Sequence, residues 1–111
     1  MSAITTHVLD TAQGRPAAGV SVRLESVDAG GSTVLGIGTT DADGRVGSLG
    51  PDRITAGHYR LVFATAAYFA ATGQDCFFPE VSLRFVVADP AQHHHVPLLL
   101  SPFAYTTYRG S

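Results

Sequence analysis

The groups best suited to chemistry in this 111-residue sequence are histidines, three of which stand in a row. His93, His94 and His95 lead into the apolar run VPLLL, which reads as a strand. Successive side chains of a strand point to opposite faces, so His93 and His95 share one face and His94 takes the other. Same-face positions lie about 7 Å apart, which suits two ligands of one metal ion, with His7 as a third candidate. A polar rim before a buried strand explains the same residues without a metal.

Other groups have the chemistry that a hydrolytic site needs, although the pattern alone does not bring them together. His7 lies in the alternating segment ITTHVLD, and Arg45 follows an Asp-Gly turn. A neutral imidazole accepts a proton from water near pH 7, and a guanidinium binds a planar ring edge and stabilises an oxyanion. Tyr108 adds a hydroxyl, Arg109 a second guanidinium, and Ser111 a carboxylate if the end of the sequence is ordered. Taken singly, each is better explained as an ordinary half-buried or solvated side chain.

The composition excludes several kinds of chemistry and partner. All seven basic residues are arginines, so Schiff-base chemistry and a lysine base are excluded. Cys76 is the only cysteine, which rules out an intramolecular disulfide, and its phenylalanine neighbours favour a buried, inert thiol. A net charge of −2 gives no indication of a nucleic-acid or membrane-surface partner. No signal peptide and no apolar stretch of membrane-spanning length is visible, so a cytoplasmic location is the default expectation.

The elements that must position these residues are predicted to be short strands. Apolar and polar residues alternate between turn signals, and strands are expected over 4–10, 20–27, 33–40, 57–65, 81–89, 93–102 and 103–109. Residues 65–74 are rich in alanine, with Tyr68 and Phe69 on one face and Gly73 suited to the C-terminal end, and predict one short helix. This spacing predicts an all-β fold: a two-sheet antiparallel β-sandwich of seven to eight strands, forming a single domain over residues 1–111.

The balance of apolar and charged residues indicates an oligomer. Hydrophobic residues make up 45% of the chain and charged residues 14%. A domain of this length has too little interior to bury so much apolar surface. Part of that surface is therefore expected to face another subunit.

Several stretches of the sequence resemble one enzyme family. ITTHVLDTAQGRPA, DGR, FFPEV and HVPLLLSPFAYTTYRGS are similar to the 5-hydroxyisourate hydrolases, relatives of transthyretin. The resemblance extends from Ile4 to Ser111. Its most specific element is the closing tetrapeptide Tyr-Arg-Gly-Ser, because the hormone-carrying transthyretins end differently.

The resemblance implies a transthyretin-like (prealbumin-like) sandwich that assembles as a homotetramer, a dimer of dimers, with sites between subunits in a central channel. The implied activity is hydrolysis of 5-hydroxyisourate to 2-oxo-4-hydroxy-4-carboxy-5-ureidoimidazoline in urate catabolism, with no cofactor and no metal. The implied catalytic residues are His7, Arg45 and His95. The implied substrate-binding residues are His7, Arg45, Tyr108, Arg109, Gly110 and Ser111. Members of the family often have tyrosine at the position of His94, which we expect to point away from the site.

Three alternatives stay open at this level. The chain could be a transthyretin-like carrier of a small aromatic ligand without turnover, a structural or adhesion sandwich, or a protein with a zinc site at its histidine tract. Within the hydrolase hypothesis, His95 or His7 could be the general base, and the sequence does not decide between them.

Overall fold

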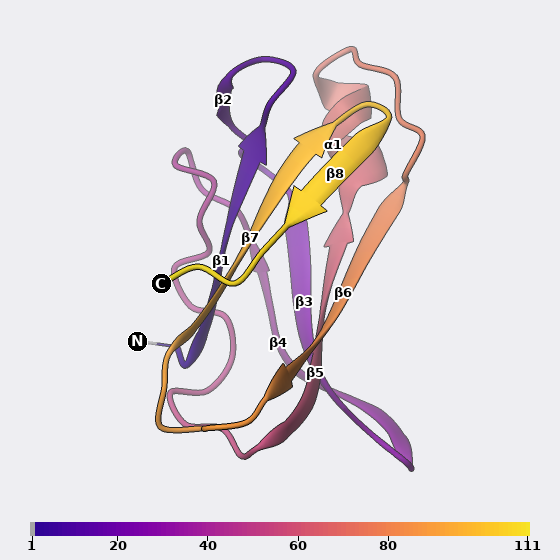
Figure 1. Cartoon of the computed structure of the whole chain (residues 1–111). Coiled ribbons are helices and arrows are strands. Elements are labelled where there is room, and N and C mark those ends of the chain that lie inside the picture. The colour runs from indigo at the N-terminus through magenta and orange to yellow at the C-terminus, as the bar shows by residue number, and fades with distance from the viewer. Residues whose placement is uncertain (1) are drawn as a thin grey trace.

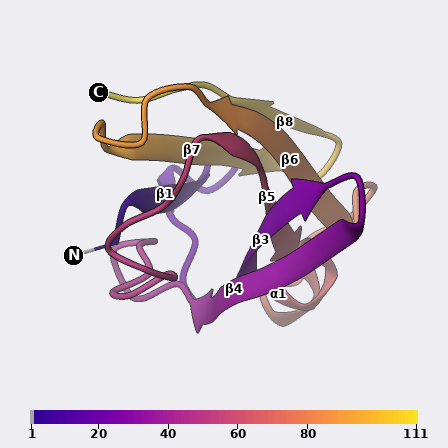
Figure 2. The same ribbon diagram turned by 90° about the horizontal axis from the view of Figure 1, so that it is seen from below.

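Two four-stranded sheets pack face to face in the computed structural model, which describes residues 2–111 (Figures 1 and 2). The elements are β1 (Ile4–Asp10), β2 (Arg15–Pro16), β3 (Ser21–Asp28), β4 (Gly31–Thr39), β5 (Gly57–Ala64), α1 (Thr65–Ala71), β6 (Glu80–Val87), β7 (His94–Ser101) and β8 (Ala104–Thr107). The strand order is β2-β1-β7-β8 in one sheet and β4-β3-β5-β6 in the other. The predicted all-β sandwich with one short helix is confirmed. The two-residue strand β2 was not anticipated.

One strand pair departs from the antiparallel pattern expected from the sequence. β1 and β7 run parallel, with Thr5 beside His95 and His7 beside Pro97, whereas the other strand pairs among the described residues are antiparallel. Antiparallel neighbours can be joined by a tight hairpin, but β1 and β7 are separated by the whole second sheet. No turn therefore fixes their relative direction.

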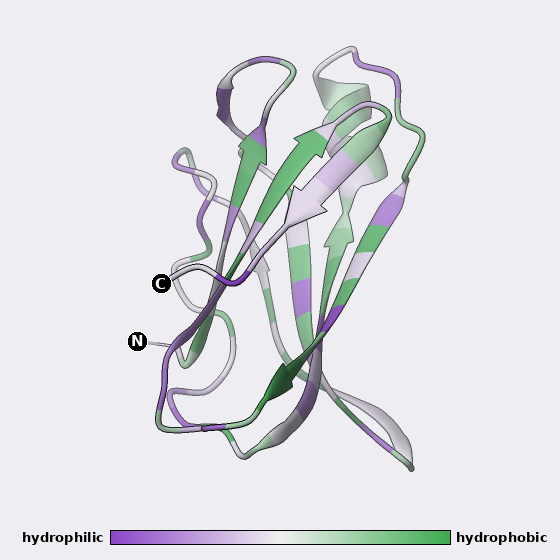
Figure 3. Ribbon diagram, viewed as in Figure 1, coloured by the Kyte–Doolittle hydropathy of each residue, from purple (hydrophilic) through white to green (hydrophobic). Residues whose placement is uncertain are grey.

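The core lies between the sheets and is built from the apolar positions of the alternating strands. Bands of opposite hydropathy follow one another along β3 and β6 (Figure 3). The largest fully buried side chains come from both sheets, the helix and one loop; among them are Ile4, Leu24, Leu49, Leu61, Phe63, Phe69 and Leu98. Because the inward face of each strand is used for packing, the outward face of β1 and β7 is left for polar chemistry.

The helix forms where alanine-rich sequence replaces the alternation. Tyr68 and Phe69 are buried as predicted, and Gly73 follows the helix with φ +68°, a conformation that glycine adopts without steric cost. The Tyr68 hydroxyl donates to Asp10 Oδ2 at 2.6 Å, and Gln74 Nε2 donates to the same oxygen at 2.9 Å. These bonds fasten the helix to the end of β1.

The thiol of Cys76, which the sequence predicted to be buried, is half-buried in the structure. Its Sγ lies 3.4 Å from the carbonyl oxygen of Phe78. Among residues 2–111, no helix has the length and apolar character needed to cross a membrane.

Candidate functional site

The parallel pairing of β1 with β7 brings the histidines of two distant segments to one sheet face. The register sets Thr5 directly beside His95, and the two strands lie side by side in Figure 1. Alternation along β7 turns His94 inward, where 3% of it is exposed, and turns His95 outward, where it is half-buried. Both His93 Nε2 and His95 Nδ1 lie 2.8 Å from Thr5 Oγ1. His93 and His95 therefore share a face that excludes His94, as the sequence predicted.

Arg45 is placed by the tight turn that precedes it. Asp41 Oδ1 accepts hydrogen bonds from the backbone amides of Asp43, at 2.9 Å, and Arg45, at 3.0 Å. Gly44 has φ +79°, and any Cβ there would collide with the carbonyl oxygen of Val8. The turn needs glycine for both reasons. It delivers the Arg45 backbone to a β-bridge with His7, at the edge of the same sheet.

The end of the sequence is held against β7. The backbone amide of Gly110 donates to the His95 carbonyl oxygen at 2.8 Å, and the two residues form a β-bridge. A Cβ at position 110 would lie 2.7 Å from His95 Cδ2, so a side chain there would press on the imidazole. Glycine at this position lets the backbone lie against the imidazole ring.

These residues lie around an open cavity of about 410 Å³, which we call the histidine cavity. Its lining includes Thr5, Thr6, Arg45, His93, His95 and Ser111. Burial lowers the pKa of His95 below its ordinary value, and the positive charges of Arg45, His7 and His93 lower it further. Since the ordinary histidine pKa is already about 6.5, His95 is neutral at pH 7 and can accept a proton.

His7 does not line the histidine cavity but forms a β-bridge with Arg45, which does, and its own hydrogen bond fixes the position of its proton. His7 Nε2 is 2.7 Å from the carbonyl oxygen of Asp43. A carbonyl oxygen only accepts, so Nε2 of His7 carries the proton and donates. Its Nδ1 is then the nitrogen left to accept when the ring is neutral. His7 therefore cannot serve as a base through Nε2 in this geometry.

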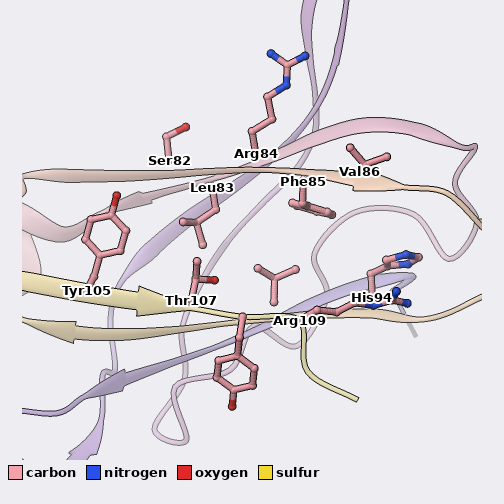
Figure 4. A pocket seen from close by; sticks show the side chains of 11 residues that line it. Ser82, Leu83, Arg84, Phe85, Val86, His94, Tyr105, Thr107 and Arg109 are labelled. Atoms are coloured by element: carbon pink, nitrogen blue, oxygen red, sulfur yellow. The ribbon is translucent and has the colours of Figure 1, made fainter.

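Tyr108 and Arg109 lie in a different place within one chain. Both line a second cavity of about 420 Å³ between the edge strands β6 and β8, which we call the edge cavity. Figure 4 shows Leu83 and Phe85 of β6 pointing into this gap. Arg109 Nη2 donates to Gln92 Oε1 at 3.0 Å, which ties this part of the chain to the loop before His93. The closing tetrapeptide is therefore divided between two places. Tyr108 and Arg109 line the edge cavity, whereas Ser111 lines the histidine cavity and Gly110 contacts His95.

The arrangement of the histidines bears on the metal alternative. Thr5 Oγ1, rather than an open space, lies between His93 Nε2 and His95 Nδ1. No group of three or more His, Cys, Asp or Glu side chains in the described part of the chain is arranged to hold a metal ion. The Nε2 of His7, the proposed third ligand, is engaged with the carbonyl oxygen of Asp43.

The sequence analysis missed Thr5. The signal was available, because Thr5 alternates with His7 on the outward face of the predicted strand over residues 4–10. The sequence alone did not single out Thr5, because threonine is common in strands. What gives Thr5 its importance is the register against His95, which no local pattern contains.

Known proteins resemble the chain over almost its full length. The 5-hydroxyisourate hydrolase of Mus musculus is 47% identical over 113 residues, covering 99% of this chain and 96% of that protein. The structure of Klebsiella pneumoniae 5-hydroxyisourate hydrolase is 37% identical, covers 97% of this chain and 98% of its own, and superimposes with a TM-score of 0.84. Sea bream transthyretin in complex with thyroxine superimposes with a TM-score of 0.90 at 33% identity, covering 96% of this chain and 93% of its own.

The match to a family model agrees with these similarities to individual proteins. The model of the HIUase/Transthyretin family matches residues 4–110, which include the turn before Arg45 and the segment that closes on His95. With this match and the 47% identity to the mouse enzyme, the chain belongs to the HIUase/Transthyretin family.

Proposed function

We propose that the chain is an enzyme of urate catabolism that hydrolyses 5-hydroxyisourate to 2-oxo-4-hydroxy-4-carboxy-5-ureidoimidazoline. The observation that carries the proposal is the histidine cavity, where a neutral imidazole and a guanidinium line one space. Hydrolysis of a cyclic amide needs a group that takes a proton from water and a group that stabilises the oxyanion. His95 and Arg45 have the chemistry for these two tasks. Relatives named as hydrolases, aligned over nearly the whole chain, support the same assignment.

His95 is the proposed general base. Its Nδ1 contacts Thr5, and its Nε2 has no hydrogen-bond partner among residues 2–111. Nε2 would take the proton as the water oxygen bonds to the ring carbonyl, and Arg45 would donate to the oxygen on which charge develops. General-base help contributes roughly 10²–10⁴-fold and a single oxyanion donor about 10²–10³-fold. His7 would assist through Nδ1.

Substrate binding is proposed for both parts of the closing tetrapeptide. Gly110 and Ser111 lie at the histidine cavity and would close it over the ring. Tyr108 and Arg109 are included because the family resemblance implies them. Within one chain they line the edge cavity, so a second subunit would have to bring them to the substrate.

A homotetramer with sites between subunits is the proposed assembly. β6 and β8 are edge strands, and they expose Val86 (58%) and Tyr105 (38%). Unpaired edges with exposed apolar side chains favour pairing with another chain. Light scattering should give about four times the 11.6 kDa chain mass, and a monomeric mass would contradict the assembly. We further propose a cytoplasmic location, testable by fractionation of the producing cells.

The experiment that tests the activity is the ultraviolet decay of freshly generated 5-hydroxyisourate, with and without the protein, in the presence of a chelator. The proposal expects faster decay that the chelator does not abolish. Decay at the uncatalysed rate would contradict it.

The second candidate is a carrier that binds a small aromatic ligand without turnover. The observation in its favour is the fold match to a transthyretin solved with thyroxine. The charged and imidazole groups of the histidine cavity weigh against it. Saturable binding of an unreactive urate analogue together with uncatalysed decay of the substrate would favour the carrier.

A further inference from the structure

The hydroxyl of Thr5 makes two hydrogen bonds that constrain each other. Thr5 Oγ1 is 2.8 Å from His93 Nε2 and 2.8 Å from His95 Nδ1. A hydroxyl has a single proton to donate. If Thr5 donates to one ring nitrogen, the other ring nitrogen must be an N–H that donates to Thr5. When both rings are neutral and Thr5 donates to one of them, two proton arrangements satisfy this geometry. A third, in which both rings donate to Thr5 and its hydroxyl donates to water, leaves no proton path from Thr5 to His93.

The two arrangements differ in what they leave at the cavity. In the first, His95 Nδ1–H donates to Thr5 and Thr5 O–H donates to His93 Nε2, so His95 Nε2 is an unprotonated acceptor. In the second, the directions reverse, and His95 Nε2 carries the proton. Only the first gives His95 a nitrogen that can remove a proton from water. In that arrangement His93 must offer an unprotonated Nε2 and keep its proton on Nδ1.

We propose that Thr5 and His93 are positioning residues that hold His95 in its Nδ1–H form, and that His93 receives the proton His95 takes from water. The inference rests on the proposed hydrolase function, of which it is a more detailed version. It assigns a use to a histidine and a threonine that the resemblance did not include in the site. His94, between the two histidines, takes no part because it faces the interior.

The proton transfer balances across the three side chains. His95 Nε2 takes a proton from the attacking water while Nδ1–H passes its proton to Thr5 Oγ1. Thr5 passes its own proton to His93 Nε2 and remains a neutral hydroxyl. His95 ends neutral with its proton on Nε2. When that proton goes to the leaving ring nitrogen, His93 Nε2–H returns a proton to Thr5 and Thr5 returns one to His95 Nδ1, which restores the starting arrangement. His93 ends as a cation, and because His93 is exposed, water can hydrate that charge.

The positions of the three groups follow from the fold. The parallel register sets Thr5 beside His95, and His93 lies two residues before it on the same face. Half-burial of His95 separates one imidazole from bulk water, while the exposed His93 stays in contact with it. The hydroxyl between them is therefore a link from the cavity to solvent.

The test measures the His95 tautomer directly, by ¹⁵N ring chemical shifts of selectively labelled protein without substrate. We expect the wild type and Thr5→Ser to show His95 with its proton on Nδ1, and Thr5→Val to show a shift toward the Nε2–H form. A wild-type His95 with its proton on Nε2 would overturn the inference. This readout needs no turnover, so it separates failure of the inference from failure of the proposed activity.

Kinetics test the role of the pair in turnover. Thr5→Val should lower kcat by about 10-fold with KM little changed, a part of the roughly 10²–10⁴-fold that general-base catalysis contributes. Thr5→Ser should restore most of that loss. Thr33→Val is the matched control, since it removes a threonine hydroxyl from an exposed position on β4 of the other sheet. Thr5→Val with wild-type kcat would overturn the role in turnover.

His93→Gln separates the two tasks assigned to His93. The glutamine carbonyl can accept the Thr5 proton, as His93 Nε2 does, but it does not become a cation at neutral pH. We expect the ¹⁵N shifts of His95 to stay as in the wild type while kcat falls by several-fold. Wild-type kcat in this variant would overturn the proton transfer to His93.

Discussion

His94 and His95 are neighbours in sequence, yet they belong to two cavities of nearly equal size and different composition. The histidine cavity, of about 410 Å³, gathers imidazoles, a guanidinium and a hydroxyl on the outward face of β1 and β7. The edge cavity, of about 420 Å³, lies between β6 and β8 and is lined largely by apolar side chains. Successive side chains of β7 point to opposite faces, so His95 lies at the histidine cavity and His94 at the edge cavity. The comparison shows that the face of the strand, rather than the residue type, decides which histidine can do chemistry.

Removing residues 109–111 is expected to lower turnover strongly, because the deletion changes both cavities at once. It removes Ser111 from the lining of the histidine cavity, Gly110 from its contact with His95, and Arg109 from the edge cavity. We expect kcat/KM for 5-hydroxyisourate to fall by about 10²-fold or more. The circular dichroism spectrum and the number of chains in the assembly should stay unchanged. Retained turnover would mean that this segment does not belong to the site.

Arg45→Gln sharpens the comparison by removing a charge from one cavity only. Loss of an oxyanion donor should lower kcat/KM by about 10²-fold. The positive charge of Arg45 also helps to lower the pKa of His95, so its removal should raise that pKa. Because His95 must be neutral to act as a base, the acidic limb of the pH–rate profile should then move to higher pH. An unchanged acidic limb would contradict the placement of Arg45 beside His95.

Gly110→Ala adds one methyl group at the contact between the chain end and His95. The new Cβ would lie 2.7 Å from His95 Cδ2, so the imidazole must move. Gly110 is not among the glycines with positive φ, and the backbone therefore tolerates alanine. We expect about a 10-fold loss of kcat with the thermal midpoint little changed, since small misplacements of a catalytic group are costly. Gly47→Ala is the control, because a Cβ there meets nothing within 4 Å.

Tyr68→Phe should have the smallest effect on turnover and act on stability instead. Burial by itself raises the pKa of the Asp10 carboxyl, but hydrogen bonds from Tyr68, Gln74 and the backbone amides outweigh it and leave the pKa below its ordinary value. Asp10 therefore contributes stability above its ordinary pKa of 3.8, and this contribution is lost as the pH falls below that value. The variant should lose about 1–3 kcal/mol at neutral pH and less at low pH.

Urea unfolding at several pH values measures this difference, with Tyr105→Phe as the control for loss of an exposed hydroxyl. An equal loss at neutral and low pH would show that Asp10 is not the partner that matters.

The sequence predicted the elements well because their signals are local. Alternation located the strands, and the alanine run with Tyr68, Phe69 and Gly73 located the helix and its end. The two-residue strand β2 and the parallel pairing of β1 with β7 carry no such signal, because they depend on which segments meet. The same holds for Tyr68 and Asp10, which lie 58 positions apart.

The candidate site was predicted in part for the same reason. Alternation placed His93 and His95 on one face and His94 on the other, and the Asp-Gly turn was recognised before Arg45. The resemblance, rather than any spacing, selected His7, Arg45 and His95 together. Thr5 was missed because its role follows from the register of β1 against β7, and that register is a property of the folded chain.

The most direct test of the account is a paired measurement of His95→Gln and His94→Gln in the decay assay for 5-hydroxyisourate. His95→Gln should lose about 10²–10⁴-fold in kcat, the range expected for a general base, and remain folded. His94→Gln removes the buried ring that donates from Nδ1 to the Gln92 carbonyl oxygen at 2.9 Å, and should lose stability while kcat stays near the wild-type value. Equal losses of kcat in the two variants, or a larger loss in His94→Gln, would contradict the assignment of catalysis to the histidine cavity.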